Sequence, residues 1–310
     1  MPQTEVPIDA SGEQVVLVAG ELRLTVVTEG GGMRELSCGD WSVLDGYGVG
    51  EVPLGAYGQV LIPWPNRLAG GRYEFEGHAY QVPLSEPAQS NALHGFARWM
   101  TWSVVERQAD RARLRLLLHP REGYPFALSV DIDYAVNPTG VSVTTTARNV
   151  GRSNLPFANG FHPYLSVGTR SIEDCRLEIP AATWLPTDER QIPTGHASVE
   201  ASLYDFRAPR VIGPTRLDTG FTNLVRDPDG MARVKLTSPD GSRRVALLMD
   251  ETYGYVMAYT GDTLADKARR RRALGVEPMT AAPNAFQTGE GLCVLSPGQA
   301  FVSRWGLEIG

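Results

Sequence analysis

The chain has 310 residues, with 29 Lys and Arg against 35 Asp and Glu, so its formal net charge at pH 7 is −6. An acidic chain is a poor candidate for sequence-independent nucleic-acid binding, which depends on a positive surface. Hydrophobic residues make up 42% of the chain, which supplies a large core and excludes disorder for most of it. The 33 Gly and 22 Pro exceed the usual share in globular proteins and favour many short strands joined by turns.

The sequence shows no signal for secretion or membrane insertion. Its apolar runs fall short of the roughly 18 residues that a membrane helix needs. The segment from Met1 to Gln14 is polar and acidic, without the basic and apolar regions of a signal peptide. Cys38, Cys175 and Cys293 have no CxxC spacing, so we expect reduced thiols rather than disulfides or a zinc site. These features predict a soluble, cytoplasmic protein.

Alternation of apolar and polar residues runs along the chain. The clearest case is 128–136, in which every second residue is apolar; the turn 137–140 separates it from a second alternating run, 141–147. This pattern predicts a long β-hairpin with one buried face. In chain order, strands or strand pairs are expected at 22–28, around the turn 76–77, at 114–118, at 128–147, around the turn 239–241 and around the turn 296–298.

The predicted elements favour an all-β fold. No stretch longer than about ten residues has a convincing helical period, and strands do not alternate with helices, so a doubly wound parallel sheet is disfavoured. Turn signals continue without a linker, a repeat or a low-complexity tract. We therefore predict one domain over residues 1–310, a single large antiparallel β-sandwich. The only charge run, 269–272, consists of four arginines and is expected in a solvated loop, with a phosphate or partner contact as the alternative.

Several chemistries are excluded because their motifs are missing. The sequence contains no P-loop, no G-x-G-x-x-G, no G-x-S-x-G and no H-E-x-x-H. The five histidines stand singly, without the spacing of metal ligands. We therefore do not expect a structural zinc site.

Four turn-rich segments carry polar residues that suit a binding site. Asn66 and Arg67 follow a Pro-Trp-Pro sequence, His94 precedes a glycine, His162 precedes a proline, and Glu277 ends an apolar run. A lone histidine is more often a structural hydrogen-bonding group, and an arginine in a loop often holds carbonyl groups. A carboxylate in apolar surroundings is costly unless it is paired, however, which favours a titrating role for Glu277.

The order and spacing of these motifs resemble those of the aldose 1-epimerase (galactose mutarotase) family. The matching motifs, from about Trp64 to the C-terminus, are Asn66-Arg67, His94-Gly95, His162-Pro163-Tyr164, Asp218 to Phe221, Glu277, Pro283 to Phe286 and Leu295 to Gly298. The resemblance implies a large β-sandwich of the galactose mutarotase type. It also implies interconversion of the α and β anomers of a free aldose such as glucose or galactose, without a cofactor.

The resemblance assigns roles to particular residues. Glu277 matches the general base, His162 the general acid and His94 a second active-site histidine. The expected sugar-binding residues are Asn66, Arg67, Asp218 and Tyr164. Glu290 is expected in a surface turn, outside the site. The implied partner is a monosaccharide, with no nucleic acid and no membrane, and the chain is expected to be a monomer or a homodimer.

Mutarotation explains why a carboxylate and a histidine are needed. A proton must leave the anomeric hydroxyl while another reaches the ring oxygen, so that the C1–O5 bond opens. We expect Glu277 to be ionised at pH 7 and His162 to be kept protonated by nearby carboxylates. Each positioned proton transfer accelerates the reaction by roughly 10²–10⁴-fold.

Departures from the family pattern leave alternatives open. The segment from His94 to Arg98 also resembles the hexose-6-phosphate 1-epimerases, in which arginines engage a phosphate, although Asn66-Arg67 favours an unphosphorylated sugar. Met257 stands where many members carry Gln, and Pro163 and Pro278 are also departures. Two further readings are a glycoside hydrolase that uses Asp218 and Glu277 as its carboxylate pair and a non-catalytic carbohydrate-binding sandwich.

Overall fold

The computed structural model describes residues 8–310. The first seven residues of the Met1 to Gln14 segment, for which we expect no signal peptide, therefore lie outside the described residues. Within residues 8–310 no helix has the length and the apolar character that crossing a bilayer requires.

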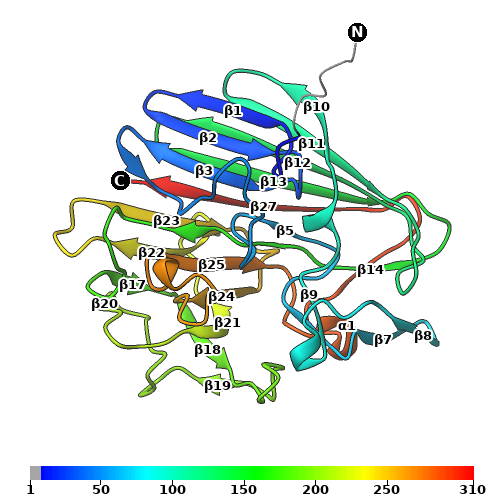
Figure 1. The fold of residues 1–310 in the computed structure, drawn as a ribbon. Coiled ribbons are helices and arrows are strands. Elements are labelled where there is room, and N and C mark those ends of the chain that lie inside the picture. The colour runs from blue at the N-terminus through cyan, green and yellow to red at the C-terminus, as the bar shows by residue number, and fades with distance from the viewer. Residues whose placement is uncertain (1–7) are drawn as a thin grey trace, which may run out of the picture.

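Two large antiparallel sheets make up the body of the molecule (Figure 1). The nine-stranded sheet has the order β10 (Ser103–Arg107), β11 (Arg111–Leu118), β12 (Leu128–Asn137), β13 (Gly140–Asn149), β27 (Ala300–Ile309), β23 (Arg244–Met249), β22 (Ala232–Thr237), β17 (Arg176–Glu178) and β20 (Arg210–Val211). The eight-stranded sheet has the order β19 (Ala197–Ser198), β18 (Ala181–Leu185), β21 (Asp218–Leu224), β24 (Tyr255–Tyr259), β25 (Leu274–Met279), β15 (Gly160–Phe161) and β5 (Val60–Leu61), and β16 (Tyr164–Leu165) also pairs with β25.

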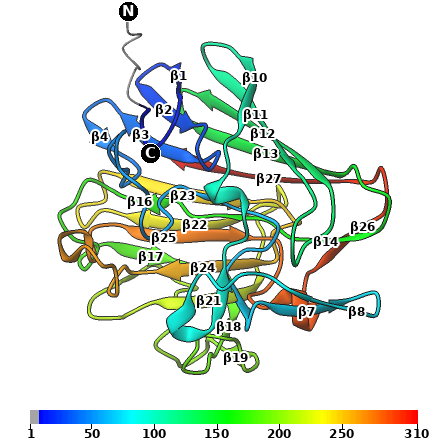
Figure 2. The ribbon, with the colours of Figure 1, turned by 45° about the vertical axis from the view of Figure 1, so that its right-hand side comes forward.

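Smaller elements surround these sheets. A four-stranded sheet of β1 (Gln14–Ala19), β2 (Leu22–Val27), β3 (Met33–Cys38) and β4 (Trp41–Ser42) packs against β11 and β12, as Figure 2 shows from a second side. Three short pairs are β6 (Arg67–Ala69) with β9 (Asn91–Leu93), β7 (Arg72–Phe75) with β8 (His78–Gln81), and β14 (Leu155–Phe157) with β26 (Cys293–Leu295). The helical segments are α1 (Ala285–Thr288), η1 (Pro87–Gln89), η2 (Ala97–Trp99) and η3 (Lys267–Arg269). The predicted all-β class is confirmed.

The predicted hairpin 128–147 forms as expected, because β12 pairs with β13 from Leu128↔Asn149 to Asn137↔Gly140. Its apolar residues are buried and their neighbours are half-exposed, which is the alternation read in the sequence. The prediction of a hairpin around 296–298 was wrong. Strand β26 pairs with β14, whereas β27 pairs with β13 over 300–308 and with β23 over 305–309.

One hydrophobic core joins the two large sheets and leaves the other face of the eight-stranded sheet free for a site. On β25, Val276 belongs to the core. Since side chains alternate along a strand, Glu277 points to the opposite face. Tyr259 on β24 and Asp218 on β21 lie in register with each other on that face, and all three line one cavity there.

Candidate active site

The cavity on the outer face of the eight-stranded sheet has a volume of about 590 Å³, which is within the usual range of ligand-binding pockets. Loops between the strands form its walls. Every site residue expected from the sequence lines it, namely Asn66, Arg67, His94, His162, Tyr164, Asp218 and Glu277. Residues far apart in sequence are thus brought together at one place.

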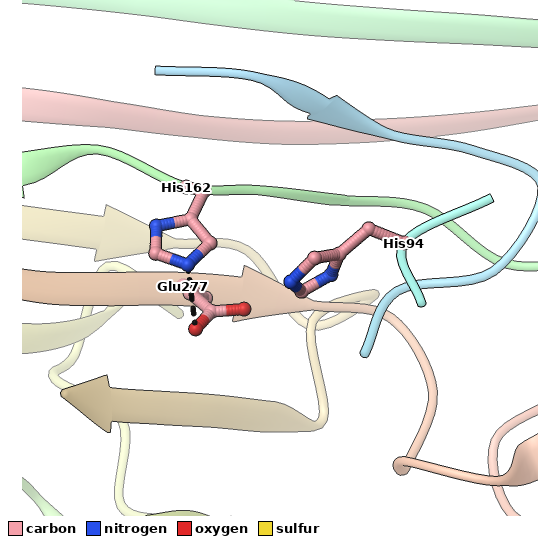
Figure 3. Close-up of side chains that lie close together, drawn as sticks. All are labelled: His94, His162 and Glu277. Carbon is pink, nitrogen blue, oxygen red and sulfur yellow. Dashed lines mark ion pairs between the residues drawn. The ribbon is translucent and has the colours of Figure 1, made fainter. Parts of the chain in front are cut away.

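His162 and Glu277 form the closest contact of this group. The Nε2 atom of His162 lies 3.2 Å from Oε1 of Glu277, and both side chains are buried. His162 lies between β15 and β16, which both pair with β25, the strand that carries Glu277. Figure 3 shows the carboxyl group of Glu277 beside the His162 ring, with the ring of His94 on its other side. The sheet pairing therefore fixes the two groups at hydrogen-bond distance.

Burial determines which partner of this pair holds the proton. Desolvation raises the pKa of Glu277 to about 8, with a further contribution from the charge of Asp218, whereas Arg67 opposes the shift. Desolvation also lowers the pKa of His162 to about 3, and the positive charge of Arg98 adds to this effect. We expected an ionised Glu277 and a protonated His162 at pH 7. Instead, burial favours the two neutral forms, so the resting proton lies on Glu277.

His94 is held in one tautomer. Its Nδ1 atom accepts a hydrogen bond of 3.0 Å from the backbone N–H of Asn66, and burial lowers its pKa well below the ordinary value. The neutral ring therefore carries its proton on Nε2 and acts there as a donor. The glycine after His94 is needed for the backbone conformation rather than for contact with a ligand. Gly95 has φ +65°, and a Cβ atom there would lie 2.0 Å from the carbonyl oxygen of Ile62.

His94, His162 and Glu277 also offer potential metal-ligand atoms that lie within 4.8 Å of one another. The sequence motifs assign all three residues to the expected site, but their spacing does not mark a metal-binding cluster, because they come from distant segments. The hydrogen bond at Nδ1 of His94 leaves only Nε2 facing away from Asn66, and that atom carries a proton. A proton donor cannot ligate a metal ion, so the cluster fits a metal poorly.

Arg67 is organised by a carboxylate that the sequence analysis missed. Its Nε and Nη2 atoms donate to Glu86 at 2.8 and 3.0 Å, a bidentate pair with fixed geometry. Asn66 has a left-handed backbone, and its Oδ1 accepts from the N–H of Arg67 at 2.8 Å. Burial raises the pKa of Asp218, although the charge of Arg67 opposes that shift. No motif in the sequence marks Glu86.

Tyr164 packs against the site more than it points into it. Its ring stacks on His162 with centroids 4.9 Å apart and on Tyr57 with centroids 4.0 Å apart. Its hydroxyl donates to the backbone oxygen of Gly55 at 2.8 Å. Tyr164 is therefore placed to hold the His162 ring, and its hydroxyl already has a partner.

The arginine run 269–272 lies in an exposed loop, as expected, and each member is also bonded to another part of the chain. Arg269 donates to the oxygen of Gly46 and pairs with Glu51. The other three bind, in order, the backbone oxygen of Leu264, the carboxylate of Asp262 and the carboxylate of Asp45. These contacts hold the loop that forms the outer wall of the cavity.

Glu290 lies outside the cavity, as expected. It is 43% exposed at its side chain and pairs with His196 at 3.5 Å.

The chain is similar to several known proteins. A family model described as aldose 1-epimerase matches residues 13–307. The Escherichia coli (strain K12) protein called "Uncharacterized protein YihR" is 34% identical over 290 residues, which are 93% of this chain and 91% of YihR. The galactose mutarotase of Rattus norvegicus is 30% identical over 164 residues, which are 51% of this chain and 47% of the rat protein. The GalM/aldose epimerase homologue from C. elegans shares the fold, with a TM-score of 0.85 at 17% identity over 96% of this chain and 98% of its own.

Proposed function

Because the chain belongs to the aldose 1-epimerase family and is therefore an isomerase, we propose that it interconverts the α and β anomers of aldohexoses such as glucose and galactose. Glu277 is the general base and His162 the general acid of ring opening. The observation that carries this proposal is the contact of 3.2 Å between His162 Nε2 and Glu277 Oε1 in the wall of the cavity. The name of the rat relative, galactose mutarotase, supports the same reaction.

The pair can cycle without gaining or losing a proton. In the resting state Glu277 holds the proton and His162 is neutral. A shift of that proton along the hydrogen bond gives a carboxylate and an imidazolium. Glu277 then takes the proton of the anomeric hydroxyl while His162 protonates the ring oxygen, and the C1–O5 bond breaks to give the open-chain aldehyde.

Ring opening returns the pair to its resting state, with Glu277 protonated and His162 neutral. Rotation about C1–C2 exposes the other face of the aldehyde. Glu277 then donates its proton to the aldehyde oxygen while His162 takes the proton of the C5 hydroxyl, and the C1–O5 bond re-forms. Ring closure therefore starts directly from the resting state.

The remaining polar groups suit the binding of a sugar. His94 presents an N–H donor beside the catalytic pair. Arg67 and Asp218 supply a donor and an acceptor of opposite charge in the same cavity, as expected for groups that hold hydroxyls while only C1 turns. Tyr164 holds the His162 ring.

Polarimetry of freshly dissolved α-D-glucose and α-D-galactose tests the proposal. The enzyme should bring the rotation to its equilibrium value faster than an enzyme-free control, with a rate proportional to protein concentration. Binding of the sugars without acceleration would support the carbohydrate-binding alternative. Release of the aglycone from an aryl glycoside would support the glycoside hydrolase alternative. A hexose-6-phosphate 1-epimerase stays the nearest alternative, and Arg98 is the residue that favours it.

A further inference from the structure

His162 lacks the hydrogen bond that usually orients a catalytic histidine. In such residues one ring nitrogen takes part in the chemistry, and a hydrogen bond at the other nitrogen fixes the tautomer and the direction of the ring. The Nε2 atom of His162 faces Glu277 at 3.2 Å. Its Nδ1 atom is buried and has no hydrogen-bond partner among the described residues 8–310. The orientation of this ring therefore depends on contacts of another kind.

The ring of His162 is the last member of a row of stacked side chains. Tyr164 stacks on His162 with centroids 4.9 Å apart and an angle of 22° between the planes. Tyr57 stacks on Tyr164 with centroids 4.0 Å apart and an angle of 21°. The guanidinium of Arg269 lies over the ring of Tyr57, 4.9 Å from its centroid. The row therefore extends from the arginine run 269–272 to the proposed acid.

The backbone of His162 is held separately, by the segment that carries Tyr57. The N–H of Gly58 donates to the carbonyl oxygen of His162 at 2.9 Å, and the N–H of His162 donates to the carbonyl oxygen of Gln59 at 3.1 Å. These bonds fix the position of the His162 backbone but not the torsion angles of its side chain. The stacked rings are therefore the contacts that restrain the plane of the imidazole.

Tyr57 contributes to this row through its ring alone. Tyr57 is 3% exposed, and its hydroxyl has no hydrogen-bond partner in the part of the chain that the structure describes. Arg269 is itself anchored, because Nη1 donates to the oxygen of Gly46 at 2.8 Å and Nη2 lies 3.3 Å from Oε2 of Glu51. A cation within about 6 Å of an aromatic centroid is attracted to the ring face. The anchored guanidinium therefore restrains the Tyr57 ring.

We propose that Tyr57 and Arg269 are positioning residues that act through Tyr164 to keep the ring of His162 aligned with Glu277. This inference rests on the proposed mutarotase function and extends its machinery to two residues outside the motifs that resemble the family. A displacement of about 1 Å at a reacting group can slow a reaction by about 10²-fold. Loss of the row should therefore lower kcat, whereas KM should change little because other residues hold the sugar hydroxyls.

Two substitutions of Tyr57 separate the ring from the hydroxyl. With α-D-glucose as substrate, Tyr57→Phe keeps the ring and should retain kcat within about twofold of wild type. Tyr57→Leu removes the ring and should lower kcat by about tenfold or more, with KM changed by less than about threefold. Tyr80→Leu is the matched control and should have the kcat of wild type. It removes one ring of the stacked pair Tyr73–Tyr80, whose centroids lie 5.1 Å apart on the β7–β8 hairpin.

A second pair of variants tests the cation without changing an aromatic ring. Arg269→Gln removes the guanidinium from Tyr57 and should lower kcat by about threefold or more. Arg270→Gln is its control, because Arg270 belongs to the same run but donates to the backbone oxygen of Leu264, and it should have the kcat of wild type. If Tyr57→Leu does not fold, the comparison of Arg269→Gln with Arg270→Gln decides.

NMR of the imidazole nitrogens follows the row without the reaction. The signals of His162 are assigned by their loss in His162→Asn. They should indicate one neutral tautomer in wild type and Tyr57→Phe, and move towards the average of the two tautomers in Tyr57→Leu.

The outcomes for the row and for the enzymatic function are distinguishable. Wild-type kcat and wild-type His162 signals in Tyr57→Leu and Arg269→Gln would overturn the proposal. Equal losses of kcat in Tyr57→Phe and Tyr57→Leu, or in Tyr80→Leu and Tyr57→Leu, would also overturn it. A wild-type protein that does not accelerate mutarotation, but whose His162 signals respond to Tyr57→Leu as expected, would overturn the mutarotase function and leave the positioning row intact.

Discussion

Asn159 and Thr280 bind each other through three hydrogen bonds. The N–H of Asn159 donates to Oγ1 of Thr280 at 2.9 Å, and the carbonyl oxygen of Asn159 accepts from the N–H and Oγ1 of Thr280 at 2.9 and 3.2 Å. Asn159 lies three residues before His162, and Thr280 lies three residues after Glu277. This link therefore joins the two segments that carry the proposed acid and base.

Replacement of Thr280 tests whether the link positions the pair. Thr280→Val leaves the buried N–H of Asn159 without its acceptor, a cost of about 1–3 kcal/mol. We expect a decrease in kcat of about tenfold with little change in KM. Thr280→Ser keeps the hydroxyl and should restore kcat to within about threefold. Steady-state kinetics together with Tm check this, and equal kcat for the Val and Ser variants at equal Tm would contradict it.

Replacement of either member of the catalytic pair should stop the chemistry. Glu277→Gln removes the proposed acceptor of the anomeric proton, and His162→Asn removes the proposed donor to the ring oxygen. Each change should lower kcat by at least about 10²-fold with a modest change in KM. Stopped-flow or polarimetric progress curves provide the measurement.

Glu290→Gln is the matched control for that experiment, because it makes the same chemical change at a carboxylate outside the cavity. It should turn over like wild type. If Glu290→Gln is inactive while Glu277→Gln is active, the base has been assigned to the wrong residue.

The pH dependence follows from the proton that the pair shares. Glu277 has a raised pKa of about 8, so it is protonated below that pH and loses its proton as the pH rises through it. Above about 8 the pair has no proton to give to the ring oxygen. We expect kcat/KM to be level from pH 5 to 7 and to fall above about 8, by about tenfold per pH unit.

Subtraction of the enzyme-free rate at each pH is required, because base catalyses mutarotation in solution. The residual activity of Glu277→Gln should lack the fall above pH 8. A wild-type kcat/KM that rises through pH 8 would mean that the active form is the ionised carboxylate beside a neutral imidazole.

The sequence was informative wherever one short segment contains the whole signal. The alternation over 128–147 predicted β12, β13 and their pairing, because a hairpin is local. The partner of β26 was not predictable in this way, since β14 lies about 140 residues earlier in the chain and the two strands meet only in the folded molecule.

The same distinction applies to the site. Its seven expected residues stand in recognisable motifs, and all seven line the cavity. Glu86 stands in no motif, and its relation to Arg67 exists only after folding. The protonation states predicted for His162 and Glu277 were wrong for a physical reason. The prediction considered only the nearby charges, but desolvation has the larger effect on both pKa values.

Removal of metal ions should leave the activity unchanged. The cluster of His94, His162 and Glu277 is compact, but the hydrogen bond from Asn66 fixes a proton on the outward nitrogen of His94. Prolonged treatment with EDTA should not alter the anomerisation rate, and equilibrium dialysis against Zn²⁺ should detect no tight site. Loss of activity that a divalent ion restores would contradict the tautomer assigned to His94.

We expect Met257 to make the enzyme tolerant of the configuration of its sugar. Met257 on β24 stands directly opposite Glu277 on β25, so the two side chains share a sheet face about 4.5–5.5 Å apart at Cβ. Its thioether cannot donate a hydrogen bond and is a weak acceptor, and an apolar lining rejects an epimer only weakly. We expect less than about tenfold discrimination in kcat/KM between glucose and galactose, which is under roughly 1.4 kcal/mol.

Met257→Gln introduces an amide that would be left unpaired by one of the epimers, so it should sharpen the preference, whereas Met257→Leu should leave the ratio unchanged. The measurement is kcat/KM for both anomerically pure sugars in all three proteins, and a wild-type ratio of a hundredfold or more would rule out this role for Met257.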